Sequence, residues 1–221
     1  MQDSSAENGT RGAGHGRADQ RAQIAQALDI SSVYLGRRPS GLRYDPCIPP
    51  ILQTHRLRLR TYSIADEAGL FEVFADPYAR RFYPEMADRA KVRAWIEWNL
   101  GNYNEFGFGL WAMEVKVEGR FVGDCGLTYQ DVEGRRELEI GYHVLERERG
   151  RGYATEAARA CLEFGFTHTS SENICSIVAP LNQASCAVAA RVHMAQREFM
   201  KGGQRLLLFY TTRHEWEAVR S

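Results

Sequence analysis

The chain has 221 residues, with 28 basic and 28 acidic side chains, so its formal net charge is zero. The strong positive field expected of a nucleic-acid-binding protein is therefore absent. No apolar run reaches the roughly 20 residues that span a bilayer, and Met1–Gln20 lacks the apolar centre of a signal peptide. We expect a cytoplasmic protein with no nucleic-acid partner and no membrane association.

The cysteines favour reduced thiols over disulfides or metal ligands. Five of them occur at irregular spacing, with no CxxC pair and no even set, namely Cys47, Cys125, Cys161, Cys175 and Cys186. With 44% hydrophobic residues the chain can build a sizeable core. We expect mostly buried, free cysteines and no metal site.

Residues 1–50 are predicted to be a disordered or loosely ordered extension. The first 19 residues are rich in Gly, Ser and charge, with too few apolar groups to offset the entropy of ordering. A short helix is possible at Gln20–Ile30, and four prolines then break regular structure before residue 51. The folded domain is therefore expected over residues 51–217.

The first ordered elements are a strand and two helices. Arg56–Arg60 alternates like a half-buried strand. Ser63 is a candidate N-cap for a helix over Ala65–Ala75, which Asp76-Pro77 ends, and a second helix is predicted over Asp88–Phe106. The aromatic and charged loop between them, Arg80–Glu85, suits either a surface anchor or a substrate contact.

A β-meander and a second mixed segment follow. Strand patterns cover 108–116, 120–130 and 136–145, separated by the turn signals Glu118-Gly119 and Glu133-Gly134. The remaining predicted elements are a helix at 154–167, a strand at 174–178, a helix at 183–192 capped by Asn182, and strands at 197–200 and 205–212. The predicted fold class is α+β, a mixed sheet flanked by helices.

The most informative stretch is Arg147–Ala158, which reads R-E-R-G-R-G-Y-A-T-E-A-A between a strand and a helix. Gly150 and Gly152 can adopt backbone angles closed to other residues and allow an anion close to the main chain. The unpaired amides and dipole of the following helix also attract anions, so the stretch suits a phosphate site. The alternative is an ordinary turn before an ordinary helix, because short glycine patterns are weak signals.

Several motifs in one order resemble the GNAT superfamily of acetyl-CoA-dependent N-acetyltransferases, and within it the RimJ/RimL-like branch. The pyrophosphate signature Gln/Arg-x-x-Gly-x-Gly/Ala is met by Arg147, Gly150 and Gly152. The motifs around it are Arg-Leu-x-Leu-Arg at 56–60, Gly-Asp-Cys-Gly-Leu at 123–127, Glu-Ile-Gly-Tyr at 139–142, Gly-Tyr-Ala-Thr-Glu-Ala at 152–157 and Asn-x-x-Ser-x-x-Val from Asn182. The resemblance covers about Thr54 to Trp216 and implies the GNAT acyl-CoA N-acyltransferase fold.

Two positions depart from the branch. Arg149 stands where the branch usually has Trp, which exchanges an aromatic wall near the cofactor for charge. His193-Met194 stands where Gly-Met or Gly-Phe usually ends the helix that begins after Asn182. A left-handed His there would cost about 1 kcal/mol relative to Gly, so we expect a poorly defined helix end.

The resemblance implies acetyl-CoA as acetyl donor and co-substrate. Backbone amides around Tyr142–Val144 are expected to face the pantetheine and the thioester carbonyl, where two strands splay apart. The full set of residues that the resemblance assigns to acetyl-CoA binding is Tyr142, His143, Val144, Arg147, Arg149, Gly150, Arg151, Gly152, Tyr153, Ala154 and Asn182.

Two catalytic residues follow from the same resemblance. Glu139 occupies the position of the strand carboxylate that acts as general base, with Glu137 two residues earlier on the same face. Ser185 replaces the Tyr that many members use to protonate the thiolate, because the matching position is Ala189. The alternatives are solvated carboxylates and a second capping hydroxyl, and His143 is interpreted as a satisfied polar side chain.

The expected activity is acetyl transfer to a primary amine, on a protein N-terminus or on a small molecule, by a monomer or homodimer. The alternative is a CoA-binding module of the same fold with little turnover, which the two departures would favour.

Overall fold

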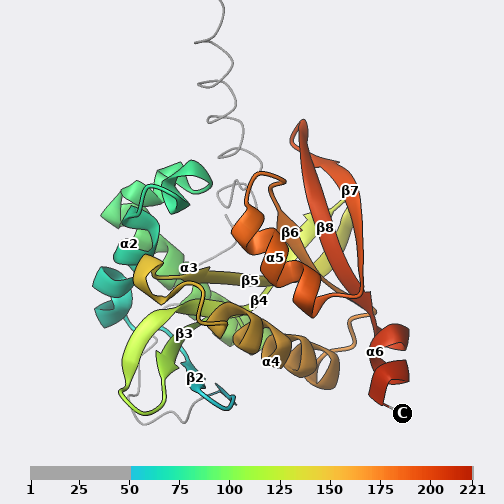
Figure 1. The fold of residues 1–221 in the computed structure, drawn as a ribbon, viewed down its shortest axis with the longest axis horizontal. Helices are drawn as coiled ribbons and strands as arrows, with labels where there is room; N and C mark the ends of the chain where they lie inside the picture. Colours follow the sequence, from blue (N-terminus) through green and yellow to red (C-terminus); the bar gives the residue numbers. More distant parts are fainter. Residues whose placement is uncertain (1–50, 221) are drawn as a thin grey trace, which may run out of the picture.

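A mixed sheet of eight strands organises the computed structural model, which describes residues 51–220 (Figure 1). The strand order is β1-β2-β3-β4-β5-β6-β8-β7, and β5 and β6 are parallel whereas the other neighbours are antiparallel. The strands are β1 Leu52–Gln53, β2 Leu57–Arg60, β3 Leu110–Val115, β4 Arg120–Val132, β5 Arg135–Val144, β6 Asn173–Val178, β7 Ala195–Lys201 and β8 Gln204–Thr212. The predicted N-terminal extension, its possible helix at Gln20–Ile30 and Cys47 lie outside the described residues.

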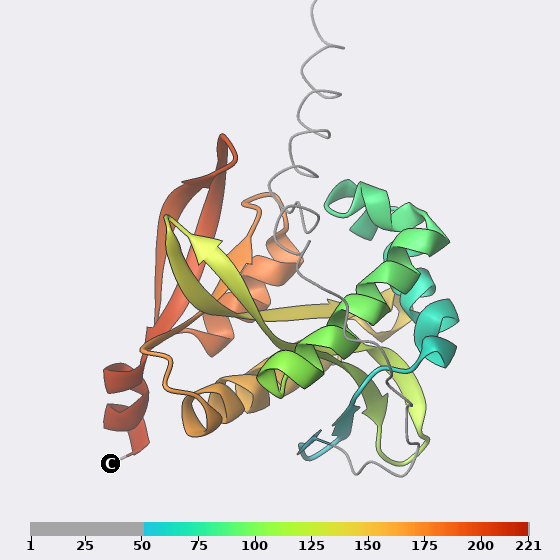
Figure 2. The same cartoon turned by 180° about the vertical axis from the view of Figure 1, so that it is seen from behind.

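Helices cover both faces of this sheet. In Figure 1 α4 runs across the near face, and Figure 2 shows α3 across the opposite face. The α-helices are α2 Glu67–Ala75, α3 Arg89–Phe106, α4 Tyr153–His168, α5 Gln183–Val192 and α6 Arg213–Arg220. Short 3-10 turns are η2 Ile64–Asp66, η3 Ala79–Arg81, η4 Pro84–Ala87 and η5 Glu146–Glu148. The predicted mixed sheet flanked by helices is confirmed.

The alternation of each strand divides the core between the two faces. In β5, Leu138 and Ile140 are buried in the cluster beneath α4, together with Cys161 and Phe166 of that helix. The opposite face holds a second cluster, formed mainly by α2, α3 and β3. Because successive side chains of a strand point to opposite faces, Glu139, Gly141 and His143 share the α2/α3 face.

The N-cap of α3 and the two predicted hairpin turns are formed in the structure. Asp88 lies just before α3 as its N-cap, and its carboxylate accepts from the amide of Ala90 at 2.9 Å. The turn glycines Gly119 and Gly134 both have positive φ angles, 63° and 79°. The helix predicted from Ala65 begins instead as η2, where the Asp66 carboxylate accepts from the amide of Ser63 at 2.8 Å.

Three features of the secondary structure were not predicted from the sequence. β1 has only two residues, too few for a periodic pattern. α6 has only eight residues and buries none of them fully, although Trp216 stacks on Phe166 with ring centroids 5.2 Å apart. The predicted loop at Arg80–Glu85 contains the last two residues of η3 and the first two of η4.

The cysteine prediction holds within residues 51–220. Cys125, Cys161 and Cys175 are buried free thiols, and Cys186 is a half-buried one.

Candidate active site

The sheet opens between β5 and β6. Their parallel pairing includes only Leu138↔Ile174 and Glu139↔Cys175, although β5 continues to Val144. Along an extended strand the amides alternate between edges, and the amide of Leu145 points toward β4, where it bonds to Val122 at 3.0 Å. The amides of Tyr142 and Val144 therefore face away from β4, into the opening.

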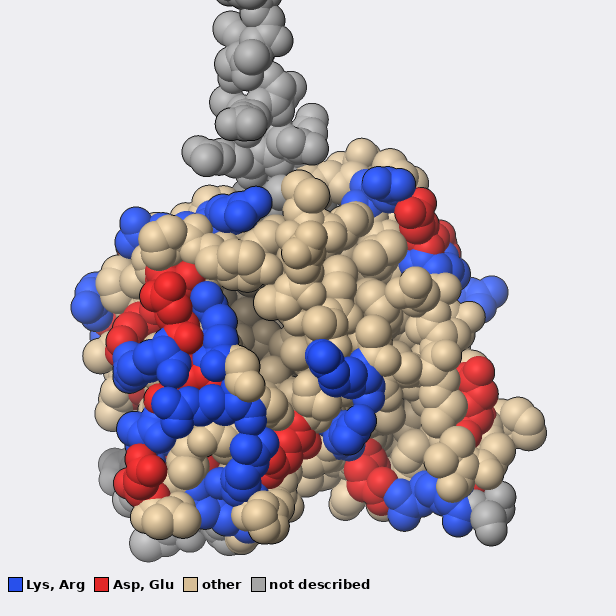
Figure 3. All heavy atoms as spheres, in the orientation of Figure 1, with Lys and Arg blue, Asp and Glu red and all other residues tan. Residues whose placement is uncertain are grey.

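A cavity of about 870 Å³ fills this opening. It is lined by the end of β5, the start of α4, the start of α5 and the η3–η4 segment. Figure 3 shows the corresponding hollow in the molecular surface, with Lys and Arg side chains on both sides of it. The predicted residues that line the cavity are Tyr142, His143, Val144, Arg149, Gly150, Gly152, Tyr153, Ala154, Asn182 and Ser185.

The glycine loop leaves its main chain open to this cavity. Gly150 and Gly152 have φ angles of 77° and 81°, and a β-carbon on Gly150 would meet no atom within 4 Å. Gly152 caps α4 in a left-handed conformation without a side-chain hydrogen bond to the first turn. The first amides of α4 are therefore free of a side-chain cap, and the helix dipole makes this end favourable for an anion.

Of the three arginines expected beside the loop, only Arg149 lines the cavity. Arg147 pairs with Glu72, and Arg151 lies 3.5 Å from Glu148, and neither side chain lines the cavity. Arg56 lies over the Tyr153 ring at 4.8 Å and donates to the carbonyl of Arg151 at 2.9 Å.

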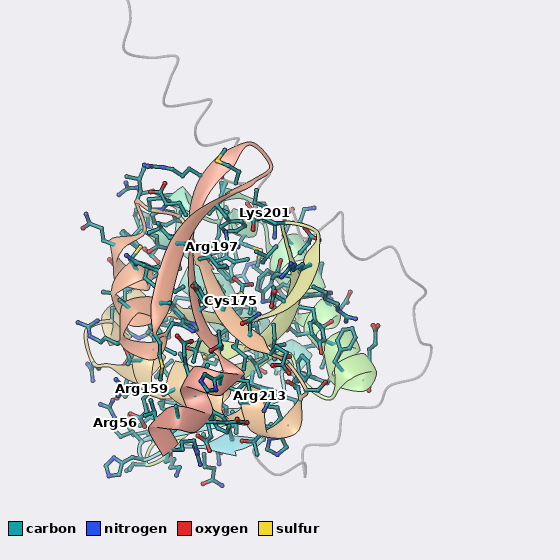
Figure 4. All side chains as sticks on the ribbon, turned by 90° about the vertical axis from the view of Figure 1, so that its right-hand side faces the viewer. Arg56, Arg159, Cys175, Arg197, Lys201 and Arg213 are labelled. Atoms are coloured by element: carbon teal, nitrogen blue, oxygen red, sulfur yellow. The ribbon has the colours of Figure 1, made fainter. Side chains whose placement is uncertain are left out.

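Arg159 and Arg191 also line the cavity, and Figure 4 shows Arg56 and Arg159 at the same end of the molecule. Arg56, Arg159 and Arg191 come from distant parts of the chain, and none of them was predicted from the sequence to line the cavity.

Arg149 is bound in place rather than pointing freely into solvent. It pairs with Asp76 at 2.5 Å, donates to the carbonyl of Val144 at 3.2 Å and lies 5.4 Å from the Tyr78 ring centre. Partial burial opposes ionisation of Asp76, but hydrogen bonds from Arg149 and from backbone amides lower its pKa. Tyr78 thus supplies an aromatic wall beside the position where the branch has Trp.

The start of α5 forms another wall of the cavity. The Asn182 side chain accepts from the amide of Ser185 at 3.2 Å, as expected of an N-cap, and from the hydroxyl of Tyr78 at 3.0 Å. Tyr142 donates its hydroxyl to the carbonyl of Ser185 at 2.8 Å, and burial raises the pKa of Tyr142. Asn182 is buried, and the half-buried Ser185 lines the cavity.

Glu139 is the last residue of β5 that pairs with β6, and it does not line the cavity. Its carboxylate accepts from the amide of Ile177 at 3.2 Å. Burial raises the pKa of Glu139, against the opposing effects of the Lys201 charge, this hydrogen bond and the charge of His143.

His143 forms a hydrogen-bonded pair with a buried carboxylate. Its Nδ1 lies 2.7 Å from Asp124 Oδ1, and Asp124 is 0% exposed. Tyr62 donates to the other oxygen of Asp124 at 2.6 Å. The sequence interpretation treated His143 as a polar side chain, and Asp124 was noticed only as part of a family motif.

His193 ends α5 differently from the prediction. Its φ and ψ angles of −97° and 158° are extended, so the expected left-handed strain is absent. The buried ring connects Thr211 Oγ1 at 3.3 Å with Ser176 Oγ at 3.1 Å, and Ser176 donates to the carbonyl of Ile140 at 2.8 Å. These bonds hold β6 to β5 just where the strand pairing ends.

A family model for the acetyltransferase (GNAT) domain matches residues 56–195. The chain belongs to the GNAT family of acetyltransferases. It is therefore an acyltransferase enzyme, and the glycine loop, the opened strands and α5 all fall within the matched residues.

Two curated bacterial proteins are similar to this GNAT chain over most of their length. It is 40% identical to the uncharacterized protein YkkB of Bacillus subtilis over 144 residues, which cover 65% of this chain and 84% of YkkB. It is 27% identical to the uncharacterized N-acetyltransferase p20 of Bacillus licheniformis over 165 residues, covering 72% of this chain and 92% of p20.

Solved structures share the GNAT fold. An acetyltransferase from Agrobacterium tumefaciens superposes with a TM-score of 0.64 at 27% identity, covering 79% of this chain and 98% of that one. RimL, a ribosomal L7/L12 α-N-protein acetyltransferase solved with coenzyme A, superposes with a TM-score of 0.59 at 16% identity, covering 74% and 97%. The second likeness extends to the fold alone, so membership of the RimJ/RimL-like branch stays a prediction.

Two further observations concern residues 51–220. Their helices include none that is both long and apolar enough to cross a membrane. Over the same residues, His, Cys, Asp and Glu side chains form no group of three or more that could hold a metal ion.

Proposed function

We propose that this GNAT acetyltransferase transfers the acetyl group of acetyl-CoA to a primary amine. The observation that carries the proposal is the single cavity shared by the opening between β5 and β6 and the uncapped start of α4. One end offers backbone amides to a thioester, and the other offers a helix N-terminus to phosphate.

The residues present fit acetyl-CoA. The open space at Gly150 and the φ angle of Gly152 allow a pyrophosphate to approach the first amides of α4. Arg159 adds positive charge at the same wall, whereas the Arg56 guanidinium is paired with Glu156 at 2.6 Å. The amides of Tyr142 and Val144 lie where a pantetheine chain would continue the sheet in place of β6.

When bound, acetyl-CoA supplies an activated acetyl thioester. An amide of β5 facing the opening would donate a hydrogen bond to the carbonyl oxygen as negative charge develops there. The Ser185 hydroxyl, at the opposite wall, is proposed to protonate the departing sulfur. Replacing Ser185 with Ala should then lower kcat with little change in acetyl-CoA affinity, and an unchanged kcat would exclude this role.

The acceptor side of the cavity is aromatic. Phe74, Tyr78, Phe82 and Tyr83 line it from α2 and the η3–η4 segment, which supports a substrate-contacting role for this segment. Aromatic faces attract ammonium groups and pack against hydrocarbon, so they suit an amine on an apolar chain. A protein N-terminus and a small-molecule amine both satisfy this description.

A matched pair of glycine variants tests acetyl-CoA binding. Gly150 and Gly119 have φ angles of 77° and 63°, and a β-carbon on either would meet no atom within 4 Å, but only Gly150 lines the cavity. Gly150→Val and Gly119→Val therefore strain the backbone similarly. By isothermal titration, Gly150→Val should lose at least about tenfold in acetyl-CoA affinity, or about 1.4 kcal/mol, and Gly119→Val should not. Equal affinities in the two folded variants would exclude this binding mode.

Turnover separates an enzyme from a CoA-binding module. Thiol release from acetyl-CoA should be measured over a panel of N-terminal peptides, polyamines, amino acids and aminoglycosides. Release that requires an amine supports acetyl transfer, whereas tight acetyl-CoA binding with no release for any amine would favour the module.

A further inference from the structure

The β4–β5 register brings Asp124 and His143 together. They are direct partners across the two strands and lie on the same face of the sheet. Asp124 Oδ1 and His143 Nδ1 are 2.7 Å apart, and the carboxylate is fully buried with the Tyr62 hydroxyl on its other oxygen. A buried carboxylate in this position stabilises the tautomer in which Nδ1 carries the proton.

The imidazole is fixed in orientation and reaches the cavity. The rings of Phe74 and Tyr83 lie 4.9 Å from it and the ring of Trp95 lies 5.9 Å away, so three aromatic side chains hold its plane. His143 lines the cavity with a side chain that is 10% exposed. Among residues 51–220, Nε2 of His143 has no hydrogen-bond partner, and with Nδ1 protonated this nitrogen carries the free lone pair.

We propose that His143 is the general base of this acetyltransferase and that Asp124 is its positioning residue. This inference rests on the proposed function. It differs from the sequence prediction, which gave the proton to Glu139.

The surroundings of the two candidates favour His143. Glu139 does not line the cavity, and its carboxylate is bound to the amide of Ile177. The titratable groups that face the imidazole are Asp124 from β4, Glu139 from β5 and Tyr83 from the η3–η4 segment, while α2 and α3 contribute Phe74 and Trp95. Both carboxylates favour the imidazolium that forms when Nε2 takes a proton, so Glu139 acts through its charge.

The proposed step balances as follows for a neutral amine. The nitrogen attacks the thioester carbonyl carbon, and its proton passes to Nε2 of His143 as the C–N bond forms. The C–S bond breaks, and the sulfur leaves with the bonding electron pair and takes a proton at the α5 wall, which solvent replaces there. The imidazolium then returns its proton to solvent, and the products are an amide and a free thiol.

The test measures kcat/KM against pH on the full chain, using acetyl-CoA and the best amine of the panel. His143→Gln should lower kcat/KM by about 10²- to 10⁴-fold, the usual contribution of a positioned general base. Asp124→Asn should also lower it, because the favoured tautomer is lost. His168→Gln, which changes an exposed histidine of α4, is the matched control and should retain wild-type activity.

A second variant separates catalysis from structure. His143→Ala leaves room for free imidazole beside Asp124, and added imidazole should restore amine-dependent thiol release in a concentration-dependent way. Melting temperature and acetyl-CoA titration on each variant report on folding and donor binding. Imidazole should restore nothing to Asp124→Asn, which still contains His143.

The possible outcomes test the assignment of His143 as the base separately from the proposed acetyl transfer. A wild-type enzyme that turns over while folded His143→Gln keeps its rate and pH profile would overturn the base assignment alone. A loss in Glu139→Gln but not in His143→Gln would return the role to the carboxylate. A wild-type chain that acetylates none of the panel would overturn both.

Discussion

The two edges of β5 are built for different tasks. Toward β4 the strand forms ten consecutive residue pairs, from Gly123↔Val144 to Val132↔Arg135. Toward β6 it forms two, and its last three residues, Tyr142–Val144, border a cavity. Where β5 is not paired with β6, other hydrogen bonds must hold the two strands together. The paired edge of β5 therefore stabilises the fold, and the opened edge leaves space for a ligand.

The space around individual glycines differs in the same way between the paired strands and the cavity. A β-carbon on Gly126 would lie 2.0 Å from the carbonyl oxygen of Gly109, and one on Gly123 would lie 2.0 Å from that of His143. A β-carbon on Gly150 would meet nothing within 4 Å. The first two glycines permit close packing of the protein against itself, and the third leaves space that the protein does not fill.

The largest expected effect comes from breaking the ladder between β3 and β4, which supports the paired edge of β5. In Gly126→Val the side chain would collide with the backbone of Gly109 and Leu110, which cannot move without opening the β3–β4 ladder. We expect more than about 4 kcal/mol of lost unfolding free energy, at the extreme of single substitutions. Urea denaturation measures this loss, with Gly119→Val as the control. A Gly126→Val protein as stable as the control would contradict the close packing of β4 against β3 at Gly126.

A smaller effect comes from weakening the bonds that hold the opened edge. The chain from Thr211 through His193 to Ser176 and Ile140 requires a neutral imidazole, and burial lowers the pKa of His193 to about 4. Unfolded histidine titrates near 6.5, so the unfolded state binds more protons between pH 6.5 and 4. Stability is therefore fully present above pH 6.5 and falls as the pH drops through this window, by up to about 3 kcal/mol.

Comparison with His193→Gln isolates this contribution. Unfolding free energies of the two proteins should be measured from pH 7.5 to 4, because other groups also titrate in this range. The wild-type curve should fall more steeply below pH 6.5 than the variant curve. Parallel curves would mean that His193 is accessible to protons in the folded protein.

How far the sequence predicted the molecule depends on the range of the interactions. The Asn182 cap and the two hairpin turns were predicted because each acts within a few residues of itself. The local structure around Gly150 and Gly152 was predicted because the strand, the turn and the helix start are contiguous in the sequence. Local chemistry was therefore readable without a structure.

Contacts that depend on strand register could not be predicted from the sequence. Nineteen positions separate Asp124 from His143, and their contact depends on which residues pair across β4 and β5. Arg149 was expected to add charge beside the cofactor, but Asp76 and Tyr78 engage it from a distant turn. The helix end at Val192 was predicted correctly, but the conformation of His193 was not, because its role depends on Ser176 and Thr211 of two other strands.

Amide hydrogen exchange along β5, resolved by NMR, tests the central claim most directly. In the free protein the amides of Gly141 and His143, which face β4, should exchange slowly, whereas those of Tyr142 and Val144 should exchange fast. Acetyl-CoA should slow exchange at Tyr142 and Val144 and leave the other two unchanged. Uniform protection along the strand before acetyl-CoA is added, or no change at Tyr142 and Val144 when it is saturating, would contradict a binding site at the opened edge.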